Sequence, residues 1–201
     1  MDTIETQRST RSTAARLPRL PLRLHHHAYV VKDHEANRRF LEDLLGIPLV
    51  ATWCEKSHNS ETGEDTEFCH TFFGLADGSA LAFFQFADAE DQALFDPELP
   101  SSPFRHIALH VDAETQVAIE SRIKAAGYVE PDTFVLEHGY CRSLYINDPN
   151  GMILEFTVDA EGADAINADR LKDAHSELKR WLAGDHTTNN NYRHEEAEAA
   201  E

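Results

Sequence analysis

Alternating and helically spaced apolar positions divide the first half of the chain into short strands around one amphipathic helix. Apolar residues between 36 and 45 recur at helical spacing, Asp33 precedes them as an N-cap, and Gly46 follows them as a C-cap. A polar loop is expected at 55–65. The order β-α-β-β-β follows, with strands at 24–31, 47–53, 67–73 and 79–86.

The same order begins again after an acidic, proline-containing linker at 88–103. Asp112 caps a second helix, whose apolar face carries Ile119 and Ile123 and which ends before Gly127. Strands of this second half are expected at 104–111, near Tyr128, and at 133–136, 140–146 and 152–158. Two copies of one βαβββ unit, at 24–87 and 104–158, are therefore predicted as an internal repeat.

The last two strands of the repeat are separated by a strong turn signal. The segment Asp-Pro-Asn-Gly at 148–151 presets one turn dihedral with proline and accepts the left-handed dihedral at glycine or asparagine. The strand that leaves this turn carries Glu155 between Leu154 and Phe156. A carboxylate in such a strand is costly unless it is paired or bound to a metal, so Glu155 requires a chemical explanation.

Outside the repeat, the pattern predicts one helix and two flexible ends. Residues 1–21 are polar and basic, and we expect a disordered arm; the acidic tail at 186–201 is expected to be flexible as well. Between them, at 159–185, a C-terminal helix is expected to pack on its own domain or on a partner subunit. Its narrow apolar stripe consists of Leu171, Ala174, Leu178, Trp181 and Leu182.

The charge balance and the cysteine usage exclude several classes of function. Thirty-six acidic residues against eighteen Lys and Arg give a formal net charge of −18, which repels nucleic acid and anionic membrane surfaces. Three widely spaced cysteines fit neither a disulfide framework nor a zinc ribbon. No secretory signal and no membrane-spanning run is present, so a cytoplasmic location is expected.

The repeat, the His-bearing first strands and the segment D-P-N-G-M-I-L-E resemble the vicinal oxygen chelate superfamily over about residues 22–158. That group includes glyoxalase I, fosfomycin-resistance proteins, methylmalonyl-CoA epimerase and type I extradiol dioxygenases. The resemblance implies an α+β fold in which paired βαβββ modules form an open mixed-sheet barrel, with metal ligands on the first and last strands. The matching positions are His26, His106 and Glu155.

Two imidazoles and one carboxylate can occupy one face of an octahedral ion and leave the opposite face open. Strand alternation places His26 on one face and His25 with His27 on the other, so a register slip would exchange the candidates. Four-ligand members carry a second carboxylate where this chain has Ala82, which disfavours glyoxalase I activity. The alternative interpretation is a polar strand end at 25–27 and a salt-bridging Glu155.

The spacing from His138 through Tyr145 to Glu155 resembles the signature of single-module extradiol dioxygenases, with Leu136 departing from its first position. The resemblance implies that His138 and Tyr145 are catalytic residues beside a bound catechol, where they could hydrogen-bond or accept a proton. The alternative is that His138 is a loop residue and that Tyr145 is a core aromatic with a solvated hydroxyl.

Three further residues are candidates for substrate binding: Arg142, His110 and Phe84. Arg142 could bind a substrate carboxylate or pair with a surface acid; His110 could face the site or be a core histidine; Phe84 could wall an apolar pocket or fill the core. Two-domain extradiol enzymes carry an acid/base histidine where this chain has Asp91. The substitutes are His58, His70 and His110.

The resulting hypothesis is an Fe(II)-dependent dioxygenase that cleaves an aromatic vicinal diol with O2 and acts as a homodimer. Mn(II) or Zn(II) would suit the alternative of a glyoxalase-like isomerase, lyase, epimerase or thiol transferase. A third alternative is a non-catalytic small-molecule binding or resistance protein. Retention of all three ligand positions speaks against that alternative.

Overall fold

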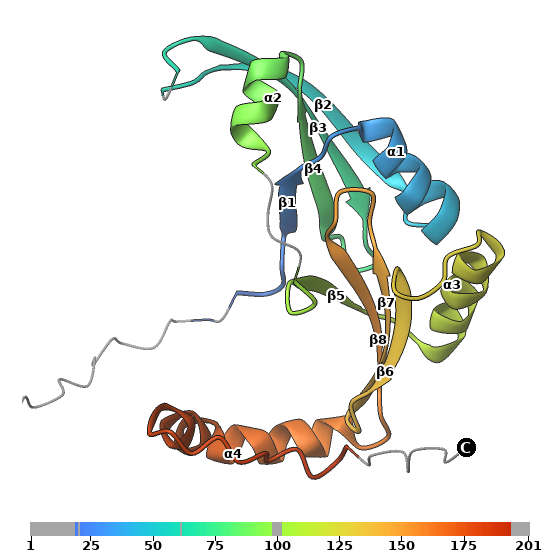
Figure 1. Ribbon diagram of the computed structural model, residues 1–201, viewed down its shortest axis with the longest axis vertical. Coiled ribbons are helices and arrows are strands. Elements are labelled where there is room, and N and C mark those ends of the chain that lie inside the picture. The colour runs from blue at the N-terminus through green and yellow to red at the C-terminus, as the bar shows by residue number, and fades with distance from the viewer. Residues whose placement is uncertain (1–18, 20, 61, 98–101, 194–201) are drawn as a thin grey trace, which may run out of the picture.

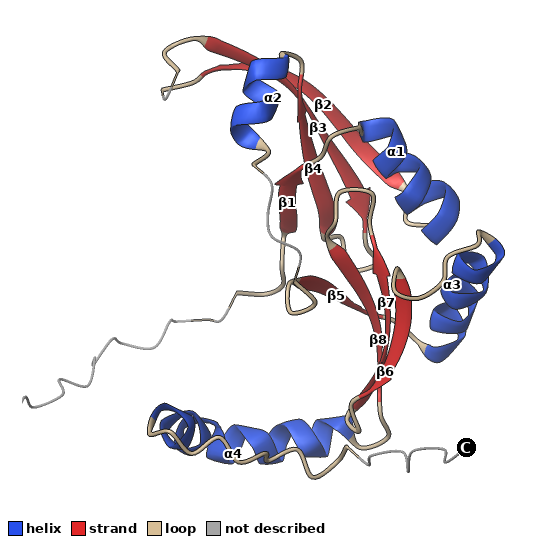
Figure 2. Cartoon of the chain, viewed as in Figure 1, coloured by secondary structure: helices blue, strands red, loops and turns tan. Residues whose placement is uncertain are grey.

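The computed structural model describes residue 19 and residues 21–60, 62–97 and 102–193 (Figure 1). Nearly all of the arm expected at 1–21 and the last part of the tail expected at 186–201 lie outside these residues. The described chain forms two separate four-stranded sheets with helices beside them, which is an α+β architecture (Figure 2).

The first sheet belongs to the N-terminal half of the chain and has the strand order β1-β4-β3-β2, with β1 parallel to β4 and the other neighbours antiparallel. Asp33 caps the helical segment by accepting hydrogen bonds from two backbone N–H groups, and Gly46 ends it at a φ of 82°. The elements are β1 (His26–Val30), α1 (His34–Arg38), the π-helical η1 (Arg39–Leu45), β2 (Leu49–His58), β3 (Asp65–Gly74) and β4 (Ala80–Phe86).

The second sheet repeats this topology with the order β5-β8-β7-β6, and β5 runs parallel to β8. Asp112 caps its helix by accepting a 2.7 Å hydrogen bond from the backbone N of Thr115. The elements are β5 (His106–His110), α3 (Ala113–Ala125), β6 (Thr133–Glu137), β7 (Cys141–Asn147) and β8 (Ile153–Asp159). The predicted pair of βαβββ units is therefore confirmed.

Three details differ from the expectation. The hairpin of β2 and β3 extends into the expected loop at 55–65, where no apolar pattern marks the strands and Lys56 lies 3.5 and 3.6 Å from the carboxylates of Asp65 and Glu67. The acidic linker contains a short helix, α2 (Ala89–Phe95), which Asp88 caps. The prediction of a strand near Tyr128 is wrong, because the described residues form no strand there.

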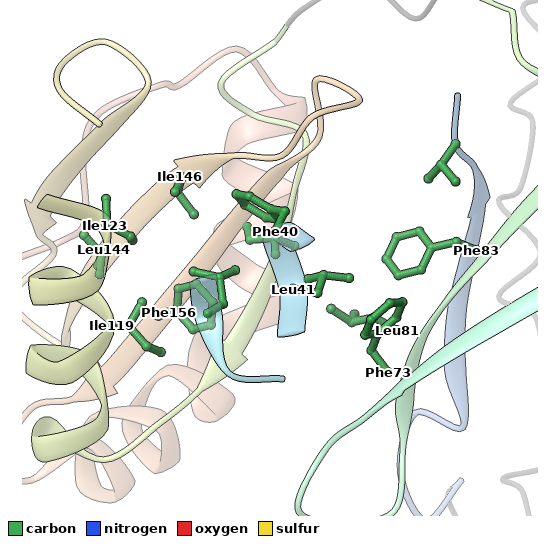
Figure 3. Close-up of a cluster of buried hydrophobic side chains, with 13 residues drawn as sticks. Phe40, Leu41, Phe73, Leu81, Phe83, Ile119, Ile123, Leu144, Ile146 and Phe156 are labelled. Carbon is green, nitrogen blue, oxygen red and sulfur yellow. The ribbon is translucent and has the colours of Figure 1, made fainter. Parts of the chain in front are cut away.

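The hydrophobic core lies where the helices of the two units meet the sheets (Figure 3). From η1, Phe40 and Leu41 are 4% and 1% exposed and belong to the same buried cluster as Ile119 and Ile123 of α3. Apolar residues of both sheets complete it: Phe73, Leu81, Phe83, Leu144, Ile146, Leu154 and Phe156. Each sheet thus packs one face against α1 and η1 or against α3, as expected from strand alternation. On the other face of the first sheet, α2 meets only the end of β4, where the Phe86 ring lies 4.9 Å from that of Phe95.

The predicted turn at 148–151 also ties the two units together. The Asp148 carboxylate, 6% exposed, accepts 2.8 Å hydrogen bonds from the backbone N of Asn150 and of Met152 within the turn. It also accepts a hydrogen bond from the hydroxyl of Tyr29 on β1. Burial and, secondly, the charge of Asp148 raise the pKa of the Tyr29 phenol, so the hydroxyl stays a donor.

The C-terminal helix α4 (Ala163–Leu182) confirms the predicted helix and lies to one side of the second sheet (Figure 2). Two residues of its apolar stripe, Leu171 and Leu182, are 78% and 75% exposed, which shows that the described chain does not cover the stripe. Part of the tail returns to the body, where Asn190 Nδ2 donates a 3.1 Å hydrogen bond to the backbone O of His138. Among the helices in the described part of the chain, none combines the length and the hydropathy of a membrane span.

The contact between the units can be tested with Tyr29→Phe, which removes only the hydroxyl that faces the buried Asp148 carboxylate. We expect the free energy of unfolding to fall by about 1.5–3 kcal/mol, because a hydrogen bond to a charged group is lost. Urea denaturation measures the change. As a control, Tyr140→Phe alters a tyrosine that is 43% exposed and should cost less than about 0.5 kcal/mol. Equal losses in both variants would contradict this account.

Candidate metal centre and active site

Glu155 lies in the interior of the second sheet, beside Ala108 on β5 and opposite Tyr145 on β7. The residue is only 6% exposed, and its Oε2 lies 3.0 Å from Nε2 of His106. A carboxylate withdrawn from water requires a partner of this kind. Two of the three expected metal ligands are therefore adjacent.

Tyr145 and His138 extend this pair into a connected polar set. The Tyr145 hydroxyl hydrogen-bonds with Glu155, and it lies 3.0 Å from Nε2 of His138, which follows β6. Because a phenol has one proton, Nε2 of His138 is the donor whenever that proton faces the carboxylate. The Phe134 ring stacks on Tyr145 at a centroid distance of 4.8 Å and fixes the orientation of the phenol.

The surroundings of Tyr145 keep its hydroxyl protonated. Burial is the largest cause, and the neighbouring Glu155 adds to it through its charge and its hydrogen bond, while a hydrogen bond with Ser143 acts in the opposite direction. Together they raise the pKa of Tyr145 to about 12. At neutral pH the phenol is thus a hydrogen-bond donor.

The polar set lies on the face of the second sheet that α3 does not cover. Helix α3 packs on the opposite face, where Gln116 Nε2 donates hydrogen bonds of 3.0 and 2.7 Å to the backbone O of Arg142 and of Phe156. His106 and Ala108 are exposed on the uncovered face. On this face the imidazole of His106 reaches solvent, and the carboxylate of Glu155 and the phenol of Tyr145 lie buried beside it.

His26 occupies the equivalent position on the first sheet. Its partner in the register is Ala80 on the parallel strand β4, and its ring lies 6.3 Å from that of His70 and 5.6 Å from that of Phe72. His27 faces the other way, toward Tyr29, at a ring distance of 5.5 Å. The strand register thus separates His26 from His27 as the alternation predicted.

The single chain does not bring His26 to the pair formed by His106 and Glu155. Within the described residues, no group of three or more His, Cys, Asp or Glu side chains is placed to hold a metal ion. The three-ligand set therefore stays a prediction, since within the described chain each unit keeps its own candidate ligands on its own sheet. The donor types still fit a divalent ion, because a buried carboxylate oxygen and an imidazole nitrogen lie 3.0 Å apart.

The structure does not bring Arg142 to this polar set. It lies on the covered face of β7 and forms ion pairs of 3.1 Å with Glu120 and 3.2 Å with Glu137. Pairing with acids, which was the alternative to substrate binding, is what the structure shows. His110 shares the face of His106 but is 68% exposed at the side chain, with Asp159 at 3.5 Å, so it is not a core histidine.

Among the substitutes for the missing acid/base histidine, His70 is the one that lies near His26. Its ring stacks on Phe84 at a centroid distance of 3.7 Å, and its Nε2 is buried without a hydrogen-bond partner. Burial and the charge of His26 lower the pKa of His70, which favours the neutral imidazole. His58 is exposed and lies beside Asp65. His70 and Phe72 are two positions apart on β3, so their side chains point to the same face of the sheet. This alternation was the signal in the sequence that could have selected His70.

Comparison with known proteins agrees with this architecture. A family model described as the Glyoxalase/Bleomycin resistance protein/Dioxygenase superfamily matches residues 23–156. No curated protein matches the sequence.

Solved structures resemble the chain at low identity. The fosfomycin resistance protein FosX from Listeria monocytogenes is 19% identical, with 72% of this chain and 98% of that chain covered and a TM-score of 0.49. Oxidase ChaP-H2 is 20% identical, with 70% and 96% covered and a TM-score of 0.46. A glyoxalase/dioxygenase from Nostoc punctiforme is 19% identical, with 73% and 97% covered and a TM-score of 0.47. Because these TM-scores are below 0.5, the family assignment rests on the family model.

The raised pKa of the Tyr145 phenol can be tested by ultraviolet titration of metal-free protein. At about pH 10.5 an ordinary tyrosine, with a pKa near 10, is mostly ionised. Tyr145 should contribute no phenolate there, because its pKa is raised to about 12. The spectra of the wild type and of Tyr145→Phe should therefore show equal phenolate absorbance. An excess of one phenolate in the wild type would contradict the assigned environment.

Proposed function

The chain belongs to the Glyoxalase/Bleomycin resistance protein/Dioxygenase superfamily, and from this premise we propose that it is a metal-dependent, extradiol-type dioxygenase that cleaves an aromatic vicinal diol with O2. The observation that carries the proposal is the connected set of His106, Glu155, Tyr145 and His138 on one uncovered sheet face. A site with a buried carboxylate, an imidazole and a protonated phenol side by side suits a substrate that presents acidic hydroxyl groups.

In this proposal the metal is held by His26, His106 and Glu155. Fe(II) is the best candidate, with Mn(II) or Zn(II) as alternatives; when bound, a ferrous ion would hold the diol oxygens and supply the redox chemistry that dioxygen requires. Two structures of FosX from Listeria monocytogenes are described as complexed with Mn(II), which is a property of that protein.

The residues around the metal ligands would bind and orient the diol. The Tyr145 hydroxyl would donate a hydrogen bond to a substrate oxygen, and Nε2 of His138, 3.0 Å away, would hold the phenol in position. On the first sheet, His70 would accept a proton as a neutral imidazole, while Phe84 and Phe72 would pack against the aromatic ring.

We propose that a second copy of the chain completes the site. His26 lies on the uncovered face of the first sheet, while His106 and Glu155 lie on the uncovered face of the second. Pairing two copies so that the first sheet of one faces the second sheet of the other would form two equivalent sites and cover both faces. The exposed apolar stripe of α4 offers a further surface for the homodimer.

The remaining partners follow from charge and redox state. We propose a small aromatic substrate and O2 as the only other partners, since a net charge of −18 repels nucleic acid. The three cysteines are free, which supports a location in the cytoplasm.

The reaction is tested by loading the protein with Fe(II) without oxygen and then adding air and a panel of catechol-type diols. We expect a yellow ring-fission product that forms with equal uptake of O2. Glu155→Gln should lower the metal affinity by more than about 100-fold, the upper end for losing an outer-shell partner of a metal. The control Glu67→Gln alters a side chain that is 64% exposed and should change nothing.

Two results would contradict this proposal. Absence of product across the panel from iron-loaded protein would exclude the ring-cleaving reaction. Turnover of a substrate without O2 uptake would instead indicate a metal-dependent isomerase, lyase, epimerase or thiol transferase.

The shared site is tested by mixing two inactive variants, His26→Ala and Glu155→Ala. If the site lies between copies, a mixed dimer contains one intact site, so random exchange should restore about a quarter of the wild-type metal content. If the three ligands come from one chain, mixing restores none. Sedimentation of the mixture checks that dimers are present.

A further inference from the structure

Cys54 and Cys69 are directly opposite each other on neighbouring strands of the first sheet. Their side chains lie on the face of the sheet opposite to that of His26. Cys54 lies on β2 and is exposed, while Cys69 lies on β3 and is half-buried. The adjacent residue His70 points to the opposite face, toward His26. The proposed dioxygenase reaction therefore leaves this pair of thiols unused.

The register of the hairpin decides how close the two residues lie. The backbone N of Asn59 donates a 2.8 Å hydrogen bond to the O of Glu64, and the pairing continues without a shift from His58–Asp65 to Cys54–Cys69. Asn59 and Glu64 are therefore a hydrogen-bonded pair. Hydrogen-bonded and non-hydrogen-bonded pairs alternate in an antiparallel ladder, and Cys54 lies an odd number of positions from Asn59, so Cys54 and Cys69 form a non-hydrogen-bonded pair.

The other neighbour of β3 gives the same register. The backbone N of Ala87 on the β4 side donates a 2.9 Å hydrogen bond to the O of Glu67, so the backbone of Glu67 faces β4. The backbone N–H and C=O of Cys69, two residues further along, face β4 as well. They therefore form no backbone hydrogen bond with Cys54 on β2.

Non-hydrogen-bonded pairs meet the geometry of a disulfide. Their Cα atoms lie about 4.5 Å apart and their side chains approach most closely. A disulfide requires Cα atoms roughly 4.4–6.8 Å apart and Cβ atoms roughly 3.5–4.5 Å apart. The two thiols can therefore join without movement of the backbone.

The surroundings hold the pair in place and leave one thiol accessible. A ring nitrogen of His34, Nε2, lies 3.0 Å from the backbone O of Cys69, which ties β3 to the start of α1. Burial and, secondly, a hydrogen bond with Cys54 raise the pKa of the Cys69 thiol. Cys54 is the thiol that meets solvent, and Lys56 follows it on the same face of β2.

We propose that Cys54 and Cys69 are a site of reversible oxidation, at which a peroxide converts the two thiols into a cross-strand disulfide. The Cys54 thiol loses its proton, and the thiolate attacks one oxygen of hydrogen peroxide and breaks the O–O bond; the departing hydroxide takes up that proton, which leaves a sulfenic acid and one water. The Cys69 sulfur then attacks the Cys54 sulfur and displaces hydroxide, which takes up the Cys69 proton and leaves as a second water. Two thiols are oxidised and one peroxide is reduced.

The test is oxidation of the folded, full-length chain with hydrogen peroxide, followed by alkylation in denaturant and tryptic peptide mapping. Cleavage after Lys and Arg places the cysteines on three different peptides, 40–56, 57–105 and 125–142. We expect two of the three thiols to disappear, with one cross-link between peptides 40–56 and 57–105. Dithiothreitol should reverse it, and Cys141, which is 8% exposed, should remain alkylated.

A matched control moves one thiol to the other face of the same strand. In the double variant Cys54→Ser with Trp53→Cys, the thiol stands opposite His70 and should form no cross-link with Cys69. Wild-type protein in urea should lose its selectivity for the two cysteines, because the strand register is lost. Circular dichroism confirms that each variant is folded.

Three outcomes would overturn the proposal. These are a cross-link of equal yield in the control variant, a disulfide that includes Cys141, and oxidation of Cys54 to sulfinic acid without a cross-link. None of them depends on the metal centre, so the result is independent of the proposed dioxygenase reaction.

Discussion

The buried carboxylate of Glu155 is the constraint on which the arrangement of the second unit depends. A strand that otherwise packs apolar residues into a core places this charge at 6% exposure, where it must be paired. His106, one strand away, meets one carboxylate oxygen at 3.0 Å, and Tyr145 approaches from the strand on the other side. The order β5-β8-β7 is what makes both contacts possible, because β8 has these two strands as its neighbours.

The two units share one topology and divide their strand faces in the same way. One face of each sheet packs against helices, where Leu41 and Ile123 are both 1% exposed. The other face carries the polar side chains, with His26 on the first sheet and His106 on the second. Because side chains alternate strictly along a strand, the apolar positions that form the core also determine which residues reach the uncovered face.

This division explains why some candidate residues belong to the polar set and others do not. Tyr145 and Arg142 lie on the same strand, but their positions differ by an odd number, so they point to opposite faces. Tyr145 meets Glu155, whereas Arg142 meets Glu120 beside the helix. A substrate on the uncovered face would contact the phenol and not the guanidinium.

The repeat, the helix caps and the turn could be predicted from the amino-acid pattern, because these features depend on local chemistry. Asp33 and Asp112 cap helices, and the glycine of the turn adopts a φ of 84° as the Asp-Pro-Asn-Gly motif requires. The two strands that flank this turn also followed from the sequence, and the structure pairs Tyr145 with Glu155 in them. Helix α2 and the ends of β2 and β3 were not predicted, because their acidic residues carry no apolar period.

The positions of the candidate ligands relative to one another depend on how the two sheets pack in three dimensions. Spacing along the chain places a histidine on each first strand, but it contains no information on how the two sheets are oriented, since the packing of η1 and α3 sets that orientation. The structure therefore brings Glu155 to His106 and keeps His26 with His70 on the other sheet. Strand parity can be read from a sequence, whereas the distance between two sheets depends on long-range packing that no local pattern encodes.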